Sequence, residues 1–171
     1  MDEREHILHG LHGLDNAEPA VLNALSRLFD FRTYNGLELC AQGDPADRLW
    51  VLGHGQISVT RSLAQRRPCE VAVMGPTAMI GFSGLMGIET RSASLKAVGA
   101  IEVLEMSTEA AMDLLDTEGS RVASAFRVAI IAAVSRQVTA ANTNIAKLAV
   151  KVGLAESVNI DERLLAAHTL L

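Results

Sequence analysis

Short runs in which apolar and polar residues alternate fill most of the chain between residues 33 and 106. They read LELCAQ, RLWVLG, QISVTRS, EVAVMG, SASLKAV and IEVLEMS. The turn residues between them are Asn35-Gly36, Gly43-Asp44-Pro45, Gly53 to Gly55, Gly75-Pro76 and Gly99. Short strands separated by turn signals in this way are typical of a β-sandwich or a β-barrel. The pattern therefore predicts a β domain in the middle of the chain.

Helical periodicity appears on both sides of this β region. Residues 1 to about 31 read as helical, and the stretch DNAEPAVLNALSRLF offers Asp15 or Asn16 as a cap. After the β region, STEAAMDLLD predicts a helix capped by Ser107 or Thr108. A longer helix is predicted from about residue 119 to residue 152. The fold class is therefore α+β, mainly β.

The long helix carries a regular apolar seam. Spacings of three and four residues join Ile131, Val134, Val138, Ala141, Ile145, Leu148 and Val152. Such a heptad pattern predicts packing against a second helix, most simply in a two-fold homodimer. The alternative is a helix buried against its own barrel. A second apolar face, made of Phe126, Ala129, Ile130 and Ala133, is available for that contact.

Composition narrows the class of protein. The formal net charge is −5 and 49% of the residues are hydrophobic, which fits a globular domain and disfavours nonspecific binding to nucleic acid. The longest apolar run, VAIIAAV, is far shorter than a membrane span, and the N-terminus lacks the apolar segment of a signal peptide. We therefore expect a cytoplasmic protein with no membrane contact. Cys40 and Cys69 are expected to be buried, reduced thiols.

No catalytic or metal-binding set stands out, so the chain is not expected to be an enzyme or to carry a cofactor. It has no Gly-x-Ser-x-Gly elbow, no His-Glu-x-x-His motif and no P-loop. His6, His9 and His12 are spaced by three, so only adjacent pairs could share a metal, and we expect solvated side chains. His54 is expected to lie in a hairpin turn with a structural role.

The stretch IGFSGLMGIETRSASLKA places a glycine-rich turn ahead of Arg91. Gly81 to Met86 can form a turn and a short helix, which gather main-chain N–H groups on one side and favour an anion. An arginine folded back onto this place adds a two-pronged donor suited to phosphate. Taken alone, the spacing also fits an ordinary turn beside a surface arginine.

The wider context resembles the cyclic-nucleotide-binding domain family, which includes the sensor domains of Crp-Fnr-type transcription regulators. LELCAQGDPADRLWVLGHGQISV resembles the opening strands of the family. MGPTAMIGFSGLMGIETRSASLKAVGAIEVLEMS resembles its phosphate-binding cassette and closing strands, and the long helix resembles its dimerisation helix. The resemblance implies a jelly-roll β-barrel with N-terminal helices over 1–118, a dimerisation helix over 119–152 and a short helical tail over 153–171.

The resemblance also implies a ligand site. In the family, an arginine pairs with the cyclic phosphate, the cassette backbone and the next residue add hydrogen bonds, and a glutamate accepts from the ribose 2′-hydroxyl. The positions carried over are Gly81, Phe82, Ser83, Gly84, Leu85, Arg91 and Ser92. On the long helix, Asn142, Thr139 or Thr143 could meet the base. Phe82 occupies the place of the glutamate, which predicts weaker binding of an ordinary cyclic nucleotide.

We therefore expect a dimeric, non-enzymatic regulatory module that binds a cyclic nucleotide or a related phosphate-bearing signal. It would signal to a partner protein through repacking of the long helices. One alternative is a ligand-free scaffold, in which Phe82 plugs the site and Arg91 pairs with a local acid such as Glu89. Another is the sensor half of a Crp-Fnr-like regulator without its helix-turn-helix. Since only about 20 residues follow Lys151, direct DNA binding is not expected.

Overall fold

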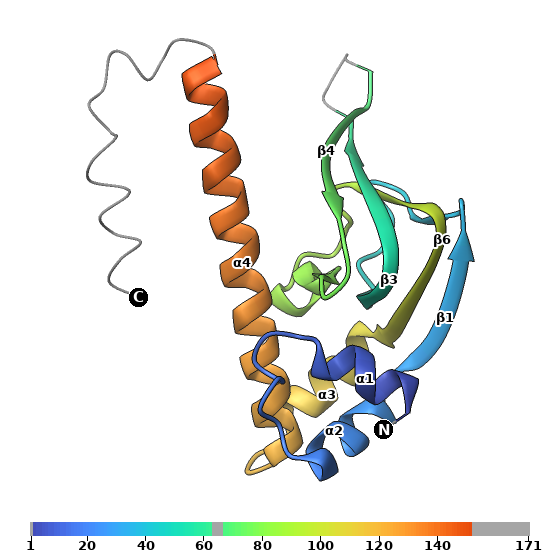
Figure 1. Cartoon of the computed structure of the whole chain (residues 1–171), viewed down its shortest axis with the longest axis vertical. Coiled ribbons are helices and arrows are strands. Elements are labelled where there is room, and N and C mark those ends of the chain that lie inside the picture. The colour runs from blue at the N-terminus through green and yellow to red at the C-terminus, as the bar shows by residue number, and fades with distance from the viewer. Residues whose placement is uncertain (1, 63–66, 152–171) are drawn as a thin grey trace. The chain divides into compact units, whose positions relative to one another are not determined.

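The computed structural model describes residues 2–62 and 67–151. The chain divides into two compact units, residues 1–133 and 134–171. The first unit contains the elements α1 (Glu3–His9), α2 (Pro19–Ser26), β1 (Asp30–Asn35), β2 (Glu38–Cys40), β3 (Arg48–Arg61), β4 (Cys69–Met74), β5 (Met79–Ile80), the 3₁₀ helix η1 (Phe82–Met86), β6 (Ser94–Ser107) and α3 (Thr108–Asp116) (Figure 1). Helix α4 (Arg121–Lys151) begins in the first unit and continues into the second.

The strands form one six-stranded sheet with the order β1-β6-β3-β4, in which β2 also pairs with β6 and β5 with β3. Every pairing is antiparallel. In Figure 1, α1, α2 and α3 gather at one end of the strands. This arrangement confirms the predicted α+β, mainly β, jelly-roll class with flanking helices.

Two of the predicted turns lie inside strands. Gly53 to Gly55 falls within β3, and Gly99 falls within β6, so four of the predicted short strands are two long ones. The pairing of β3 with β6 shifts register on both sides of His54, as at a β-bulge. Gly55 has φ +84, and a Cβ atom there would lie 2.5 Å from the carbonyl oxygen of Ala100. The glycines therefore serve a bulge and a close approach, and His54 is an exposed strand residue instead of a turn residue.

The predicted cap of the second helix was also wrong. Helix α2 begins at Pro19 after Glu18, which makes no side-chain capping bond. Proline suits the first helical position because its φ is already helical and its missing N–H is not needed there. Asp15 instead accepts a hydrogen bond from the Gly13 amide. By contrast, Ser107 caps α3 as predicted, accepting from the Ala110 amide.

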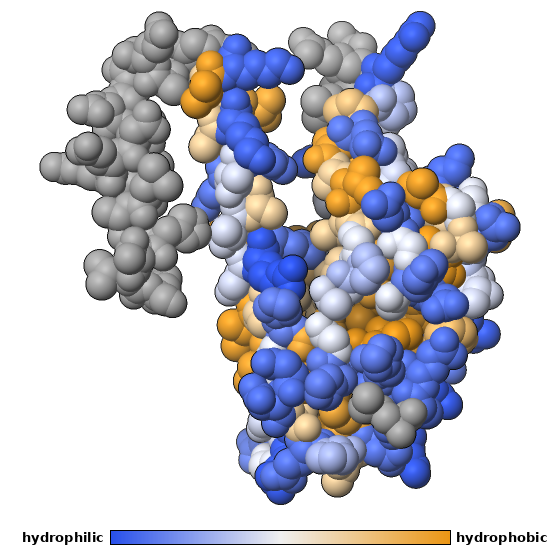
Figure 2. Space-filling model, in the orientation of Figure 1, coloured by the Kyte–Doolittle hydropathy of each residue, from blue (hydrophilic) through white to orange (hydrophobic). Residues whose placement is uncertain are grey.

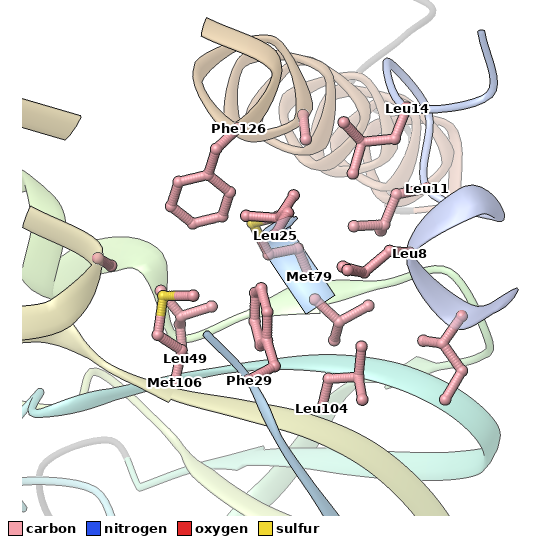
Figure 3. Close-up of a cluster of buried hydrophobic side chains, with 14 of the residues drawn as sticks. Leu8, Leu11, Leu14, Leu25, Phe29, Leu49, Met79, Leu104, Met106 and Phe126 are labelled. Carbon is pink, nitrogen blue, oxygen red and sulfur yellow. The ribbon is translucent and has the colours of Figure 1, made fainter. Parts of the chain in front are cut away.

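The helices and the sheet enclose a shared core, which we call the helical core. Its fully buried members include Leu8, Leu14, Leu25, Phe29, Leu49, Val51, Leu104, Phe126 and Ala129. Figure 3 shows Phe126 projecting from α4 toward this cluster, and its ring meets that of Phe29 edge to face at 6.3 Å. Alternate residues of β3 turn the other way: Trp50 and Leu52 belong to a second cluster, the barrel core.

The two apolar faces of α4 behave differently. Phe126 and Ala129 are buried in the helical core, and Ile130 and Ala133 pack against it, which confirms the predicted barrel-facing side. The seam residues Ile131, Val138, Ile145 and Leu148 are 54–65% exposed. Hydrophobic and strongly hydrophilic residues both appear along the upper part of α4 in Figure 2. Val152, the last predicted seam position, lies outside the described residues, as does the predicted C-terminal helix.

The α4 helix also contains an 18-residue window with a mean hydropathy of 1.3, which by length and composition alone could cross a membrane. Arg127 and Arg136 limit the length of the unbroken apolar run in α4, while the alanines and valines between them raise its mean hydropathy. Only 17% of the window is buried.

The cysteines and the N-terminal histidines follow their predictions with one exception. Cys40 is buried and free, whereas Cys69 is exposed, because it opens the edge strand β4. His6 and His9 are exposed. Within residues 2–62 and 67–151, no group of His, Cys, Asp and Glu side chains could hold a metal ion.

Candidate functional site

The glycine-rich stretch forms the turn and short helix that the sequence predicts. Gly81 adopts the left-handed conformation (φ 87, ψ 7) where β5 ends, and η1 starts directly after it. Gly87, also left-handed, ends η1 by donating its amide to the carbonyls of Ser83 and Gly84. The first amides of a 3₁₀ helix have no partner inside the helix, so they are available to an acceptor outside it.

The main chain of Arg91 is fixed by the turn that precedes β3. The Arg91 amide donates to the carbonyl of Asp44 at 2.8 Å, and the Gly43 amide donates to the carbonyl of Arg91 at 2.9 Å. The side chain turns inward and is only 5% exposed. Its Nη1 donates to the Gly81 carbonyl at 3.2 Å, and its Nη2 donates to the Arg48 carbonyl at 2.6 Å. The guanidinium therefore lies beside the glycine turn.

Two further groups flank this guanidinium. The carboxylate of Asp47 lies 3.6 Å from Nη2, and the Trp50 ring lies under the guanidinium, with its centroid 4.7 Å from Cζ. The acid next to Arg91 is thus Asp47, and not the predicted Glu89, whose side chain is exposed. The Nε of Arg91 is the one buried side-chain polar atom without a hydrogen-bond partner in the described part of the chain.

Gly81 leaves no room for a larger residue at this junction. A Cβ atom there would lie 2.7 Å from the Arg48 carbonyl oxygen, 2.8 Å from Nη1 of Arg91 and 3.2 Å from Trp50. Real Cβ atoms essentially never come within 3.0 Å of such neighbours. Glycine is therefore required both by its left-handed conformation and by the close approach of the arginine.

The remaining predicted site residues lie in different surroundings. Phe82 and Leu85 are half-buried and pack against the helical core. The aromatic ring that stacks on Arg91 belongs to Trp50. Ser83 and Gly84 are half-buried in η1, and Ser92 is exposed. Asn142 is exposed on α4 in the second unit. The structure thus brings Gly81, η1 and Arg91 together, and ligand binding by these residues stays a prediction.

A buried carboxylate next to this site escaped the sequence analysis. Glu105 of β6 accepts from the Trp50 indole Nε1 at 2.8 Å, from the Tyr34 hydroxyl at 2.9 Å and from Arg48. Burial raises the pKa of Glu105, but the hydrogen bonds from Trp50, Tyr34 and Arg48 outweigh it and hold the pKa below its ordinary value. The sequence feature that could have indicated this buried carboxylate is a glutamate inside the otherwise apolar run VLEM. Its partners depend on the strand register, which pairs Trp50 with Glu105.

This arrangement has the chemistry of an anion site. A guanidinium carries five N–H donors, and two hydrogen bonds to main-chain carbonyls leave some of them for another acceptor. The charge of Arg91 is permanent, and its planar fork suits the paired oxygens of a phosphate. The start of η1 adds main-chain amides next to it.

Comparison with known proteins places this geometry in a family. Residues 34–118 match the family model of the cyclic nucleotide-binding domain. A cyclic nucleotide-gated potassium channel of Mesorhizobium japonicum is 32% identical over 110 residues, which are 64% of this chain and 29% of the channel. The chain thus spans under a third of the length of this curated relative.

Solved structures share the fold. A cyclic nucleotide-binding domain from Methylobacillus flagellatus superposes with a TM-score of 0.74 at 18% identity, covering 85% of this chain and 82% of the other. The catabolite activator protein of Thermus thermophilus gives a TM-score of 0.65 at 22% identity, covering 84% and 63%. With its antiparallel sheet, its η1 turn and its buried Arg91, the chain belongs, through residues 34–118, to the cyclic nucleotide-binding domain family.

Proposed function

We propose that this chain is a non-enzymatic regulatory module that binds the phosphate of a cyclic nucleotide, or of a related signal, at η1 and Arg91. The observation that carries the proposal is the buried guanidinium of Arg91 beside the glycine turn, with its Nε lacking a partner in the described part of the chain. A buried donor without an acceptor is costly, so an anion that supplies one would be bound favourably.

The same geometry supports a route for the signal. Phe82 and Leu85 of η1 pack against the helical core, to which Phe126 and Ala129 at the start of α4 also belong. A phosphate that draws the amides of η1 toward Arg91 would shift these two side chains and so change the packing beneath the first turns of α4. The ligand acts only through its different affinity for the two packings.

The position of Phe82 bears on the ligand class. Its ring packs against the helical core and carries no carboxylate, so this side chain offers no acceptor to a ribose hydroxyl. A hydrogen bond to a charged group is worth about 1.5–3 kcal/mol, and its loss corresponds to about ten- to a hundred-fold in affinity. We therefore expect weak binding of ordinary cyclic mononucleotides, or a ligand recognised chiefly through its phosphate.

The output would pass through a cytoplasmic homodimer to a partner protein. Four residues of the predicted seam, Ile131, Val138, Ile145 and Leu148, present apolar side chains to solvent in the described chain. Exposed apolar residues at heptad spacing support pairing with a second copy. The net charge of −5 favours a protein partner over direct contact with DNA.

One observation favours a competing function, a scaffold without a ligand. Two carbonyls and Asp47 already surround the guanidinium of Arg91, as a purely structural arginine would require. In that case Arg91 joins the turn, η1 and β3 together and needs no anion.

Calorimetric titration with cyclic AMP, cyclic GMP and a cyclic dinucleotide separates the two functions. Binding should weaken about ten- to a hundred-fold in Arg91→Met, because the charged hydrogen bonds to phosphate are lost. Arg32→Met is the matched control, since Arg32 is an exposed arginine on β1. The sensor proposal fails if no ligand gives heat at millimolar concentration, or if Arg91→Met binds as tightly as Arg32→Met.

A further inference from the structure

A buried hydrogen-bonded cluster lies directly beneath the arginine of the site. Trp50 of β3 stands opposite Glu105 of β6 in the antiparallel register, and its indole N–H donates to Oε2 of Glu105 at 2.8 Å. The Tyr34 hydroxyl donates to the same oxygen at 2.9 Å, and Arg48 donates to Oε1. Three donors thus converge on one carboxylate that is 6% exposed.

Two of these donors also contact Arg91. The Trp50 ring lies under its guanidinium at 4.7 Å, and the main-chain carbonyl of Arg48 accepts from its Nη2 at 2.6 Å. The crowding at Gly81 shows how closely these groups fit, since an added methyl group would come within 3.2 Å of all three of Arg48, Arg91 and Trp50. A movement of the Trp50 indole would therefore also change the packing of the Arg91 guanidinium against it.

The two contacts differ in how they would respond to loss of the carboxylate. The Arg48 side chain is 51% exposed, so its guanidinium can turn to water. Trp50 is 2% exposed, so its N–H would have to find another acceptor inside the protein or move. The indole is thus the part of the network that depends on Glu105.

We propose that Glu105 is a positioning residue for ligand binding, which holds the Trp50 ring, and through it the guanidinium of Arg91, in the orientation that receives phosphate. This inference rests on the proposed function for its effect on affinity. Its structural part, the control of Trp50 and Arg91 by Glu105, does not depend on any ligand.

The test uses the emission of Trp50, which is the only tryptophan in the chain. In the ligand-free protein, Arg91→Met removes the cation above the indole and shifts the Trp50 emission. In a Glu105→Gln background the same substitution should give a much smaller shift, because an amide offers one acceptor oxygen where three donors converge. Glu102→Gln, on the same strand, is the matched control and should leave the shift unchanged.

Affinity gives the second measurement. Calorimetry with cyclic AMP should show about tenfold weaker binding for Glu105→Gln than for Glu102→Gln, since members of one hydrogen-bonded network couple by about this much. Where Glu105→Gln does not fold, Glu105→Asp serves instead, because it keeps the charge but withdraws the carboxylate from the indole.

The outcomes separate the two proposals. An equal Arg91→Met shift with and without Glu105 overturns the positioning role, whether or not cyclic AMP binds. A shift that depends on Glu105, in a protein that binds none of the nucleotides tested, supports the control of Trp50 and Arg91 by Glu105 and refutes the proposed function. Weaker binding by Glu105→Gln together with the lost shift supports both.

Discussion

Replacing Gly81 with alanine tests the close approach on which the candidate site depends. Gly81 has φ +87, and its added Cβ would stand 2.7 Å from the carbonyl oxygen of Arg48 and 2.8 Å from Nη1 of Arg91. Gly87 provides the matched control, because it has φ +76 but no neighbour within 4 Å of its added Cβ. The two substitutions carry the same backbone strain, and only one of them meets Arg91.

The magnitudes follow from these geometries. A left-handed L-residue costs roughly 1–2 kcal/mol, and the reduced freedom of the unfolded chain offsets about 0.4–1 kcal/mol of this, so Gly87→Ala should destabilise by about 0–1.6 kcal/mol. Gly81→Ala must also separate the Arg48 carbonyl from the guanidinium, a hydrogen bond to a charged group worth about 1.5–3 kcal/mol. We expect a total loss of about 1.5–4.6 kcal/mol for Gly81→Ala.

Equilibrium unfolding in urea, followed by the emission of the buried Trp50, measures both losses. A Gly81→Ala protein that is no less stable than Gly87→Ala would refute the reasoning. It would mean that Arg91 is not held against the turn.

Three further predictions concern other parts of the chain. Because the folded-state pKa of Glu105 lies below its ordinary value, its contribution to stability is present above about pH 4.3 and is lost as the pH falls toward the folded-state pKa. The stability gap between wild type and Glu105→Gln in thermal unfolding should therefore narrow as the pH falls below about 4.3, and a constant gap would contradict the lowered pKa. Phe82→Ala should lower the free energy of unfolding by about 1–3 kcal/mol, less than for a fully buried phenylalanine, since this ring is only half-buried against the helical core. If urea unfolding shows no loss of stability in Phe82→Ala, the ring does not pack against the helical core. Ile145→Asp should give monomers in sedimentation by placing a charge in the proposed seam, and unchanged dimers would remove the seam from the model of assembly.

Local patterns in the sequence were sufficient for features that local physics decides. Alternation along β3 and β6 predicted strands, Ser107 predicted the start of α3, and the stretch from Gly81 to Met86 predicted a turn and a short helix. The division of α4 into two apolar faces followed from its period, and the buried face was identified correctly at Phe126 and Ala129.

Features decided by distant neighbours could not be predicted in this way. A glycine that bends a strand looks the same in sequence as a glycine that ends one. A Cβ atom on Gly53 would lie 2.5 Å from the Ile7 side chain, and those two residues are far apart in the chain. The partners of Glu105 likewise depend on the register between β3 and β6, which no alternation pattern defines.

Residues Leu49 to Leu52 alternate between the helical core and the barrel core along a single strand. The two cores therefore share the backbone of β3. Local melting at α1 or α2 would expose one face of β3, and the opposite face of this strand holds Trp50 under Arg91. The N-terminal segment should thus protect the amide protons of β3 from exchange with solvent, and tightening at Arg91 should slow the fraying of α1 and α2.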